Sequence, residues 1–337
     1  MNRITVRLTV RLAALAATSL LLSGCAATVT PAATPAETSA ETPAASASYP
    51  VTVDNCGTSV TVTAAPERIV SIKSSTTELL LALGVGDRIV GSAFLDGPLP
   101  ESLAAKGADL NVISDFLPGQ EAVLGLNPDF IYGGWESNFS ADGVGERPAL
   151  GDLGVGSYVS PAACKGDFMP QPLTFDTVFA AIDEAGAIFG AAPAAAELVS
   201  TLEDELAALE PITAETSALW YSSGTTTPYV GAGVGSPAMI MAAAGLTNIF
   251  ADVNDTWTSV GWESIIEANP SVIVLVDASW NTAAAKIAHL ESDPATQVLD
   301  AVKNRRYIIL PFASTEAGLR NVEAASSTIA QFADLNE

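Results

Sequence analysis

Aromatic and small polar residues gather in the connections that follow the predicted strands. The four clearest connections are residues 73–76, 133–136, 221–224 and 277–280. In open α/β sheets a ligand binds outside the carboxyl ends of the strands, where flat rings stack on it and hydroxyls orient it. We therefore predict a site for a planar or partly apolar molecule. Its candidate ligand contacts are Lys73, Ser74, Ser75, Thr76, Gly134, Trp135, Tyr158, Tyr221, Ser222, Tyr229, Trp257, Ser279 and Trp280.

The tryptophans divide into two groups by their place in the pattern. Trp220 and Trp262 lie in predicted strand and helix segments, where packing explains a large ring best. Trp135, Trp257 and Trp280 lie in predicted connections, where ligand contact is favoured over packing.

Lys73 and the helix that follows it form a candidate anion site. Ser75 and Glu78 have the spacing of a capping box, which marks a helix start just after the predicted strand 68–72. The free amides of a helix start and the Lys73 ammonium would together attract negative charge. The alternative is an ordinary capped helix with a solvated lysine.

The chain offers little for catalysis or metal binding. His289 is the only histidine and lies in a predicted surface helix, so a Ser-His-Asp triad or a zinc site lacks partners. Gly231, Gly233 and Gly235 suggest a dinucleotide loop, but Ser236 stands where that motif requires glycine. We interpret 231–236 as a flexible loop, and we predict no catalytic residue, no metal site and no cofactor.

Two segments repeat one pattern and define the fold. Residues 120–132 and 262–274 each open with an acidic residue in a short helix, break at Asn-Pro and continue as an apolar strand. Proline ends a helix because it lacks the amide donor and restricts the residue before it. Further strands are expected near 68–72, 88–91, 218–221 and 307–310. Strands alternating with helices predict an α/β fold of two Rossmann-like lobes, each a mainly parallel sheet flanked by helices.

One long helix is predicted between the two lobes. Phe175, Val178, Phe179 and Ile182 share one face of a helix that spans 174–189. Its place between the lobes predicts a connecting helix. The expected boundaries are an N-terminal lobe at 50–172, the connecting helix at 173–192 and a C-terminal lobe at 193–337.

The first 24 residues have the pattern of a lipoprotein signal peptide. Three arginines precede the apolar run 12–22, which is too short to span a membrane, and Leu22-Ser23-Gly24-Cys25 matches the cleavage site. We expect lipid on Cys25 to anchor the chain to the cell membrane on its extracytoplasmic side. An ordinary secretion signal is the alternative. Residues 25–49, rich in Ala, Thr and Pro, predict a disordered tether.

The net charge bears on which partners the chain can bind, and the cysteines bear on whether it contains a disulfide. The formal net charge is −24, and removing the leader with its three arginines makes it −27. Such a chain lacks the basic surface that nucleic acids require. Outside the cytoplasm Cys56 and Cys164 favour a disulfide, with two buried free thiols as the alternative.

The combined pattern resembles the solute-binding lipoproteins of ABC importers that carry iron–siderophores, haem and cobalamin. The residues that carry the resemblance are 66–70, 77–84 and the two Asn-Pro copies. The resemblance implies two lobes joined by one rigid helix, a ligand between them, and a monomer that works with a permease and an ATPase. It also implies that Glu121 and Glu263 dock onto arginines of the permease. Both can equally serve as acids at the starts of their own helices.

The loops resemble more closely an actinobacterial subgroup proposed to bind a deazaflavin precursor of coenzyme F420. The similar segments are 72–78, 133–137, 159–164 and 276–281. This resemblance implies a deazaflavin ligand, with a ferric siderophore or a corrinoid as alternatives. Haem is disfavoured because His289 lies outside the predicted cleft loops. An extracytoplasmic enzyme on the same fold and an adhesive surface lipoprotein are the alternatives from other classes.

Overall fold

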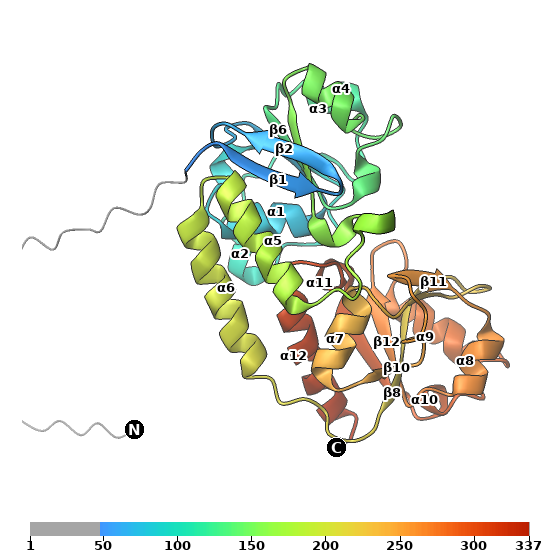
Figure 1. Cartoon of the computed structure of the whole chain (residues 1–337). Coiled ribbons are helices and arrows are strands. Elements are labelled where there is room, and N and C mark those ends of the chain that lie inside the picture. The colour runs from blue at the N-terminus through green and yellow to red at the C-terminus, as the bar shows by residue number, and fades with distance from the viewer. Residues whose placement is uncertain (1–47, 337) are drawn as a thin grey trace, which may run out of the picture. The chain divides into compact units, whose positions relative to one another are not determined.

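Two β-sheets with helices on their faces organise residues 48–336, the part of the chain that the computed structural model describes (Figure 1). The predicted signal peptide, Cys25 and nearly all of the predicted tether lie outside the described residues. None of the described helices is long and apolar enough to cross a membrane.

The first sheet is entirely parallel and has the strand order β5-β4-β3-β6-β7. Its strands are β3 (Ile69–Ile72), β4 (Ile89–Ala93), β5 (Val112–Ser114), β6 (Phe130–Gly133) and β7 (Gly156–Val159). Val70, Ile72 and Ile131 are fully buried, as expected for central strands that helices cover on both faces. The strand order reverses between β3 and β6, and doubly wound sheets bind ligands at this switch point. The connections that leave β3 and β6 therefore lie where a ligand is expected.

Short helices and one hairpin complete the first lobe. The helices are α1 (Ser74–Ala82), α2 (Glu101–Ala104), α3 (Gln120–Leu124) and α4 (Arg147–Asp152). The strands β1 (Val51–Asn55) and β2 (Thr58–Val62) pair antiparallel in a separate hairpin. Three short 3-10 helices, η2 (Glu136–Asn138), η3 (Pro161–Ala163) and η4 (Gly166–Phe168), follow β6 and β7.

The second sheet is parallel at its centre and antiparallel at one edge. Its path is β11-β9-β8-β12-β13, and β10 also pairs with β8. The strands are β8 (Ser217–Ser223), β9 (Tyr229–Gly231), β10 (Thr247–Asn248), β11 (Trp257–Ser259), β12 (Val272–Asp277) and β13 (Tyr307–Pro311). The helices are α7 (Ser236–Ala244), α8 (Trp262–Ala268), α9 (Ala283–Ser292), α10 (Asp300–Lys303), α11 (Phe312–Thr315) and α12 (Asn321–Asp334). The prediction of two α/β lobes is confirmed, and the antiparallel β8-β9-β11 edge makes this sheet mixed.

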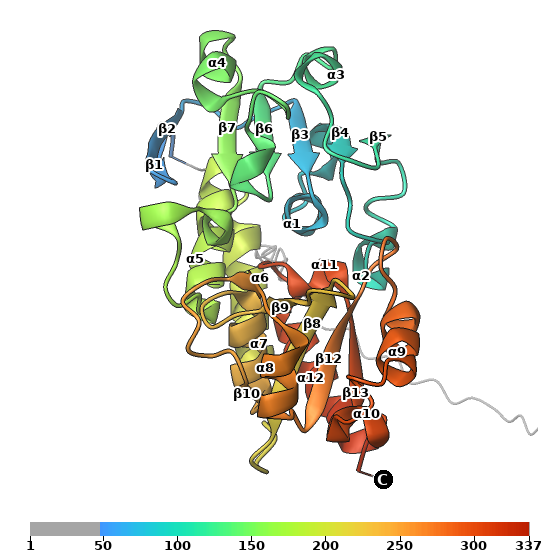
Figure 2. The same ribbon diagram turned by 90° about the vertical axis from the view of Figure 1, so that its right-hand side faces the viewer.

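Two packed helices, rather than one, lie between the lobes along the chain. The predicted helix is α5 (Phe175–Ile188), and α6 (Ala192–Ala207) packs against it (Figures 1 and 2). Phe175, Phe179 and Ile182 of α5 are buried in the core of the first lobe. The chain then turns at Gly190 (φ +71°) and runs through α6 to the second sheet. In place of the single connecting helix that was predicted, the lobes are linked by a helical hairpin, α5 and α6.

The repeated segments fold alike. In each copy a short helix, α3 or α8, leads through Asn-Pro into a central strand, β6 or β12. Asn127 (φ +49°) and Asn269 (φ +41°) both adopt the left-handed conformation, which asparagine tolerates better than most residues.

The predicted capping box at Ser75 and Glu78 is wrong. The helix α1 begins one residue earlier, at Ser74, and its N-cap residue is Lys73, whose side chain makes no capping bond. Lys73 has a φ of +88°, so the chain turns sharply between β3 and α1.

Candidate functional site

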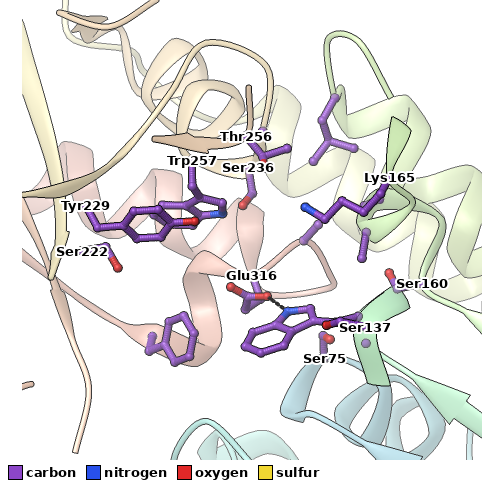
Figure 3. A pocket seen from close by; sticks show the side chains of 18 of the residues that line it. Ser75, Ser137, Ser160, Lys165, Ser222, Tyr229, Ser236, Thr256, Trp257 and Glu316 are labelled. Atoms are coloured by element: carbon purple, nitrogen blue, oxygen red, sulfur yellow. Dashed lines mark hydrogen bonds between the residues drawn. The ribbon is translucent and has the colours of Figure 1, made fainter. Parts of the chain in front are cut away.

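A pocket of about 390 Å³ is lined by residues of both sheets (Figure 3). Figure 2 shows α1 of the first lobe and α11 of the second facing each other between the sheets. The first lobe contributes Ser75, Gly134, Trp135, Ser137, Ser160, Ala162, Ala163 and Lys165. The second contributes Ser222, Ser223, Tyr229, Gly235, Ser236, Thr256, Trp257, Trp280, Phe312, Glu316 and Ala317, and Leu173 lines it from the segment before α5. Its walls are aromatic rings and hydroxyls, with one cation and one carboxylate.

Trp135 forms the aromatic wall of the first lobe. It follows β6 at the switch point, and its ring lies 5.4 Å from Phe94 in an edge-to-face arrangement. The indole N–H donates to Glu316 Oε2 of the second lobe at 2.5 Å. Gly134 lets the chain after β6 pass close to Lys73, because a Cβ there would lie 2.7 Å from Lys73 Cβ. The ring is therefore held from two sides.

The second lobe supplies four further rings. Tyr229 of β9 stacks on Trp257 of β11, with ring centroids 5.9 Å apart and planes 16° apart. The antiparallel pairing of these strands places the two rings side by side. Trp280 follows β12, is 58% exposed and meets Phe312 edge to face at 5.6 Å. A ring with that exposure is available to a ligand.

Lys73 does not form the predicted anion site. Its side chain is buried and forms an ion pair with Asp96. Its ammonium lies 3.8 Å from the Trp135 ring centroid and 5.0 Å from that of Phe312. Burial raises the pKa of Asp96, and Lys73 opposes that rise. The predicted anion site is wrong because an internal carboxylate already occupies it.

Ser74 and Thr76 are also absent from the pocket. Asp96 Oδ2 accepts the Ser74 amide, and the Ser74 hydroxyl accepts the Asp96 amide. The Thr76 hydroxyl donates to the carbonyl of Ile72 at 2.9 Å. The start of α1 is thus closed by its own side chains, and only Ser75 of this stretch reaches the pocket.

Neither Tyr158 nor Tyr221 lines this pocket, and Tyr221 lines a second cavity that is described below. Tyr158 is fully buried and donates to Glu184 of α5, and burial raises its pKa. Tyr221 is fully buried, donates to the Gly224 carbonyl at 2.8 Å, and has a pKa raised to about 12 by burial. Both tyrosines lie within strands, where successive side chains point to opposite faces of the sheet. Their rings therefore point into the packed layers on the faces of the sheets. Ser279 lines a different cavity, described below.

The segment 231–236 is fixed rather than flexible. The amides of Ala232, Gly233 and Val234 donate to carbonyls of residues 253–256. This ladder carries Gly235 and Ser236 into the pocket wall. The prediction of a flexible loop is wrong because main-chain bonds to a distant segment are not visible in the local sequence.

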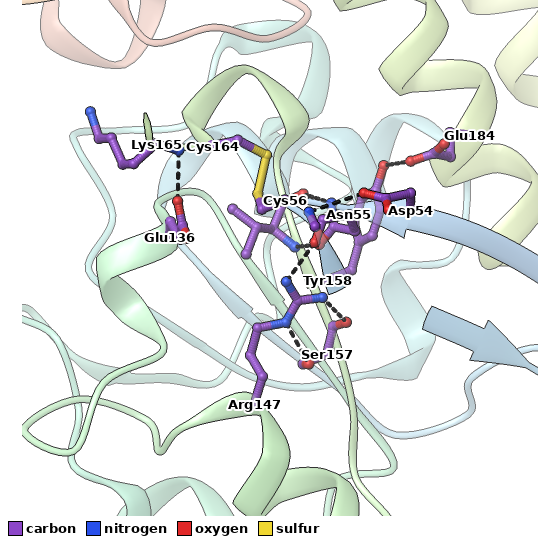
Figure 4. The surroundings of a disulfide bond; sticks show 12 residues. Asp54, Asn55, Cys56, Glu136, Arg147, Ser157, Tyr158, Cys164, Lys165 and Glu184 are labelled. Carbon is purple, nitrogen blue, oxygen red and sulfur yellow. Dashed lines mark hydrogen bonds between the residues drawn. A yellow bond between two sulfur atoms is a disulfide. The ribbon is translucent and has the colours of Figure 1, made fainter. Parts of the chain in front are cut away.

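A disulfide supports one wall of the pocket. Cys56 of the β1–β2 hairpin is bonded to Cys164, which is buried between η3 and η4 (Figure 4). Ala163 and Lys165, its neighbours, both line the pocket. The Lys165 amide donates to Glu136 Oε2 at 2.7 Å, which fixes the turn beside the disulfide.

A second polar contact joins the lobes beside the pocket. Arg320, at the start of α12, lies 3.5 Å from the buried Glu78 carboxylate of α1. Burial raises the pKa of Glu78 to about 7, with Arg320 opposing and Asp96 and Glu323 adding to the rise. Burial also raises the pKa of Glu316, which Lys73 opposes. The segment 316–320 therefore touches the first lobe at both ends.

Comparison with known proteins agrees with this architecture. A family model described as periplasmic binding protein matches residues 160–313. A solved structure titled as an ABC-type Fe3+-hydroxamate transport system from Saccharomonospora viridis superposes with a TM-score of 0.73 at 26% identity, over 85% of this chain and 99% of that one. The fold is that of a periplasmic binding protein.

Two relatives are similar to this chain in sequence. An uncharacterised ABC transporter substrate-binding lipoprotein, YvrC, of Bacillus subtilis is 26% identical over 287 residues, 82% of this chain and 83% of the relative. A vitamin B12-binding protein of Yersinia pestis is 28% identical over 226 residues, 63% of this chain and 70% of the relative.

Neither the two glutamates predicted to dock onto the permease nor the histidine lines the pocket. Glu121 is exposed in the first turn of α3 and Glu263 in the first turn of α8, one on each lobe. His289 of α9 packs against Trp262 with ring centroids 5.9 Å apart. Within residues 48–336 no cluster of His, Cys, Asp and Glu has the arrangement of a metal site.

Several pocket residues escaped the sequence analysis. Ser160, Thr256 and Glu316 were not predicted as ligand contacts, because each is brought to the pocket by a connection between distant elements. Ser236 was named only as the residue that departs from a dinucleotide motif. The one available signal was position, since Ser160 directly follows β7 and could be assigned to the edge of the first sheet.

Proposed function

We propose that this protein is the substrate-binding component of an ABC importer and holds a flat, partly apolar molecule between its lobes. The arrangement of rings carries the proposal. Trp135 of one lobe and the Tyr229–Trp257 pair with Trp280 of the other line the same cavity. Rings contributed by two lobes can enclose a planar ligand from both sides, and hydroxyls at the rim can orient it.

The ligand that we favour is a deazaflavin-type precursor of coenzyme F420. A cavity of about 390 Å³ lies at the small end of the range for ligand sites, which suits a fused tricyclic ring better than a macrocycle. The lining residues include one cation, Lys165, and no arginine, which is a weak match for a strongly anionic ferric chelate. A corrinoid or a ferric siderophore is the alternative, supported by what the relatives are named as binding or transporting.

Binding without chemistry is the role that fits the pocket. Its lining holds no histidine, and Glu316, its one carboxylate, accepts a hydrogen bond from Trp135. General acid–base catalysis needs a group within reach of the reacting atoms that is free to exchange a proton. An extracytoplasmic enzyme on this fold is therefore the weaker proposal.

We further propose that the chain works as a monomer at the cell membrane, anchored through lipid on Cys25. A permease and an ATPase would complete the importer. Glu121 and Glu263, exposed on separate lobes, would dock onto permease arginines. Two separated carboxylates that each pair with a guanidinium fix orientation as well as attraction.

Tryptophan fluorescence tests the ligand proposal. We expect a deazaflavin riboside to quench the emission of the purified protein saturably, with a Kd of about 1 μM or tighter. A ferric hydroxamate, cyanocobalamin and haem are titrated in parallel. Quenching by one of those three alone would replace the deazaflavin, and saturable binding of none of the four would contradict every ligand proposed.

A further inference from the structure

A second cavity lies directly beside the ligand pocket. It also measures about 390 Å³ and is lined mainly by the end of β8, the connection 279–282 and the start of α9. Trp280 lines both cavities. A ligand stacked on Trp280 can therefore extend past the edge of that ring into the second cavity.

Lys286 of α9 is the one charged residue in the lining of the second cavity. It is only 2% exposed, and its ammonium lies 6.0 Å from the Trp280 ring centroid. The ammonium donates to the carbonyls of Val276 and Asn281, each at 2.6 Å. A lysine ammonium carries three N–H groups, and the third has no acceptor among the described residues.

This buried cation has no carboxylate partner within residues 48–336. Asp277, whose charge acts on Lys286, instead accepts the Ala283 amide at the start of α9 at 2.7 Å. Burial lowers the pKa of Lys286 to about 8, and Asp277 opposes that change. A buried charge without a counter-ion is costly, and a ligand anion would supply what the fold does not.

We propose that the second cavity binds an anionic oxygen substituent, a carboxylate or a phosphate ester, of the molecule whose ring lies in the first pocket. Lys286 donates its third N–H to that substituent. The proposal rests on the proposed function for the ring and adds the class of its side chain. It also places the anion site at Lys286, which has no carboxylate partner among the described residues, and not at Lys73, which is paired with Asp96.

The first experiment needs no knowledge of the ring. Lys286 is titrated by NMR of isotope-labelled lysine side chains in the purified protein, with and without millimolar inorganic phosphate. We expect phosphate to raise the pKa of Lys286 from about 8 toward its ordinary value of 10.5, because the anion favours the charged form. Lys303, an exposed residue that pairs with Asp300, is the internal control and stays unchanged. An unchanged Lys286 pKa would overturn the anion site.

The second experiment compares a deazaflavin riboside with its phosphate ester. We expect the ester to bind roughly tenfold tighter, and we expect Lys286→Met to remove that difference while Lys303→Met preserves it. Lys286→Arg keeps the charge and should retain most of the preference, which guards against a variant that merely folds poorly. Equal affinities in the wild type would overturn the shared ligand. If neither compound binds but phosphate still shifts Lys286, the deazaflavin proposal fails and the anion site stands.

Discussion

At the scale of single residues, two buried lysines show how the surroundings decide what a charge does. Lys73 is paired with Asp96 and lies against aromatic rings, so its charge is satisfied within the fold. Lys286 is equally buried but has only carbonyl partners. The first lysine is therefore structural, and the second is available to a ligand.

Replacing Lys73 tests its structural role. Lys73→Met leaves the Asp96 carboxylate buried and unpaired, and we expect the free energy of unfolding to fall by about 3–5 kcal/mol. Urea unfolding at neutral pH measures it. Lys73→Met combined with Asp96→Asn should recover a large part of that loss. A single variant as stable as the wild type would show that water reaches the pair.

Trp135 is the residue whose replacement should affect binding most directly. Trp135→Phe keeps an aromatic ring but loses area and the bond to Glu316, and we expect the Kd for the bound ligand to rise about tenfold. Trp220→Phe is the matched control. Trp220 is fully buried in the core, and its indole N–H has no partner among the described residues. Equal Kd values for the two variants would remove Trp135 from the site.

At the scale of elements, the contact between α1 and α12 should make stability depend on pH. The pKa of Glu78 is about 7 in the fold and near its ordinary 4.5 when unfolded. Between these values the folded state holds a proton that the unfolded state has lost, so stability falls as pH rises through this window. The predicted fall is about 3 kcal/mol.

Comparing the wild type with Glu78→Gln isolates this contribution. Asp96 and Glu316 also have raised pKa values, so only the difference between the two proteins belongs to Glu78. Urea unfolding at a series of pH values should show the wild type losing stability relative to Glu78→Gln as pH rises. Asp334→Asn, at an exposed position near the far end of α12, should lack that trend. If the difference in free energy of unfolding between the wild type and Glu78→Gln did not change with pH, the Glu78 carboxylate would be hydrated in the fold.

The disulfide should support both the fold and the pocket. Cys56 and Cys164 close a loop of 108 residues, so replacing both by serine should cost about 4–5 kcal/mol in the chain-entropy model. The wall that carries Ala163 and Lys165 should also loosen, which weakens ligand binding. Thermal unfolding and fluorescence titration measure the two effects. Lower stability with unchanged ligand affinity would show that the disulfide does not support the pocket wall.

The sequence predicted elements better than it predicted side-chain partners. Periodicity, which each segment carries within itself, predicted α5 and the strands β3, β4, β6, β8, β12 and β13. It did not predict the remaining strands of the two sheets, which are short: β5, β7, β9, β10 and β11. The pairing of Lys73 with Asp96 depends on where a chain segment 23 residues away passes over α1. Tyr158 and Tyr221 were predicted as ligand contacts, yet both lie inside strands, and strand alternation set their direction. Trp135 and Trp280 lie in connections as predicted, whereas Trp257 belongs to β11, and all three line the pocket.

At the scale of the whole molecule, the strongly acidic surface bears on any encounter with a partner. A net charge of −24 attracts a basic surface at long range without specifying orientation. Glu121 and Glu263 can add orientation because each belongs to a different lobe and both are exposed. A test of docking must therefore separate the two positions from the total charge.

Charge reversal at both positions makes that separation possible. Glu121→Lys with Glu263→Lys should abolish ligand uptake by the assembled importer, since two like charges would then face the permease arginines. The Kd of the isolated protein for ligand should stay unchanged, because neither residue lines the pocket. Asp152→Lys with Asp334→Lys is the matched control: both positions are exposed, one on each lobe, and the total charge changes equally. If the control pair also abolished uptake, bulk charge would explain the loss, and if the docking pair transported normally, the two glutamates would have no part in docking.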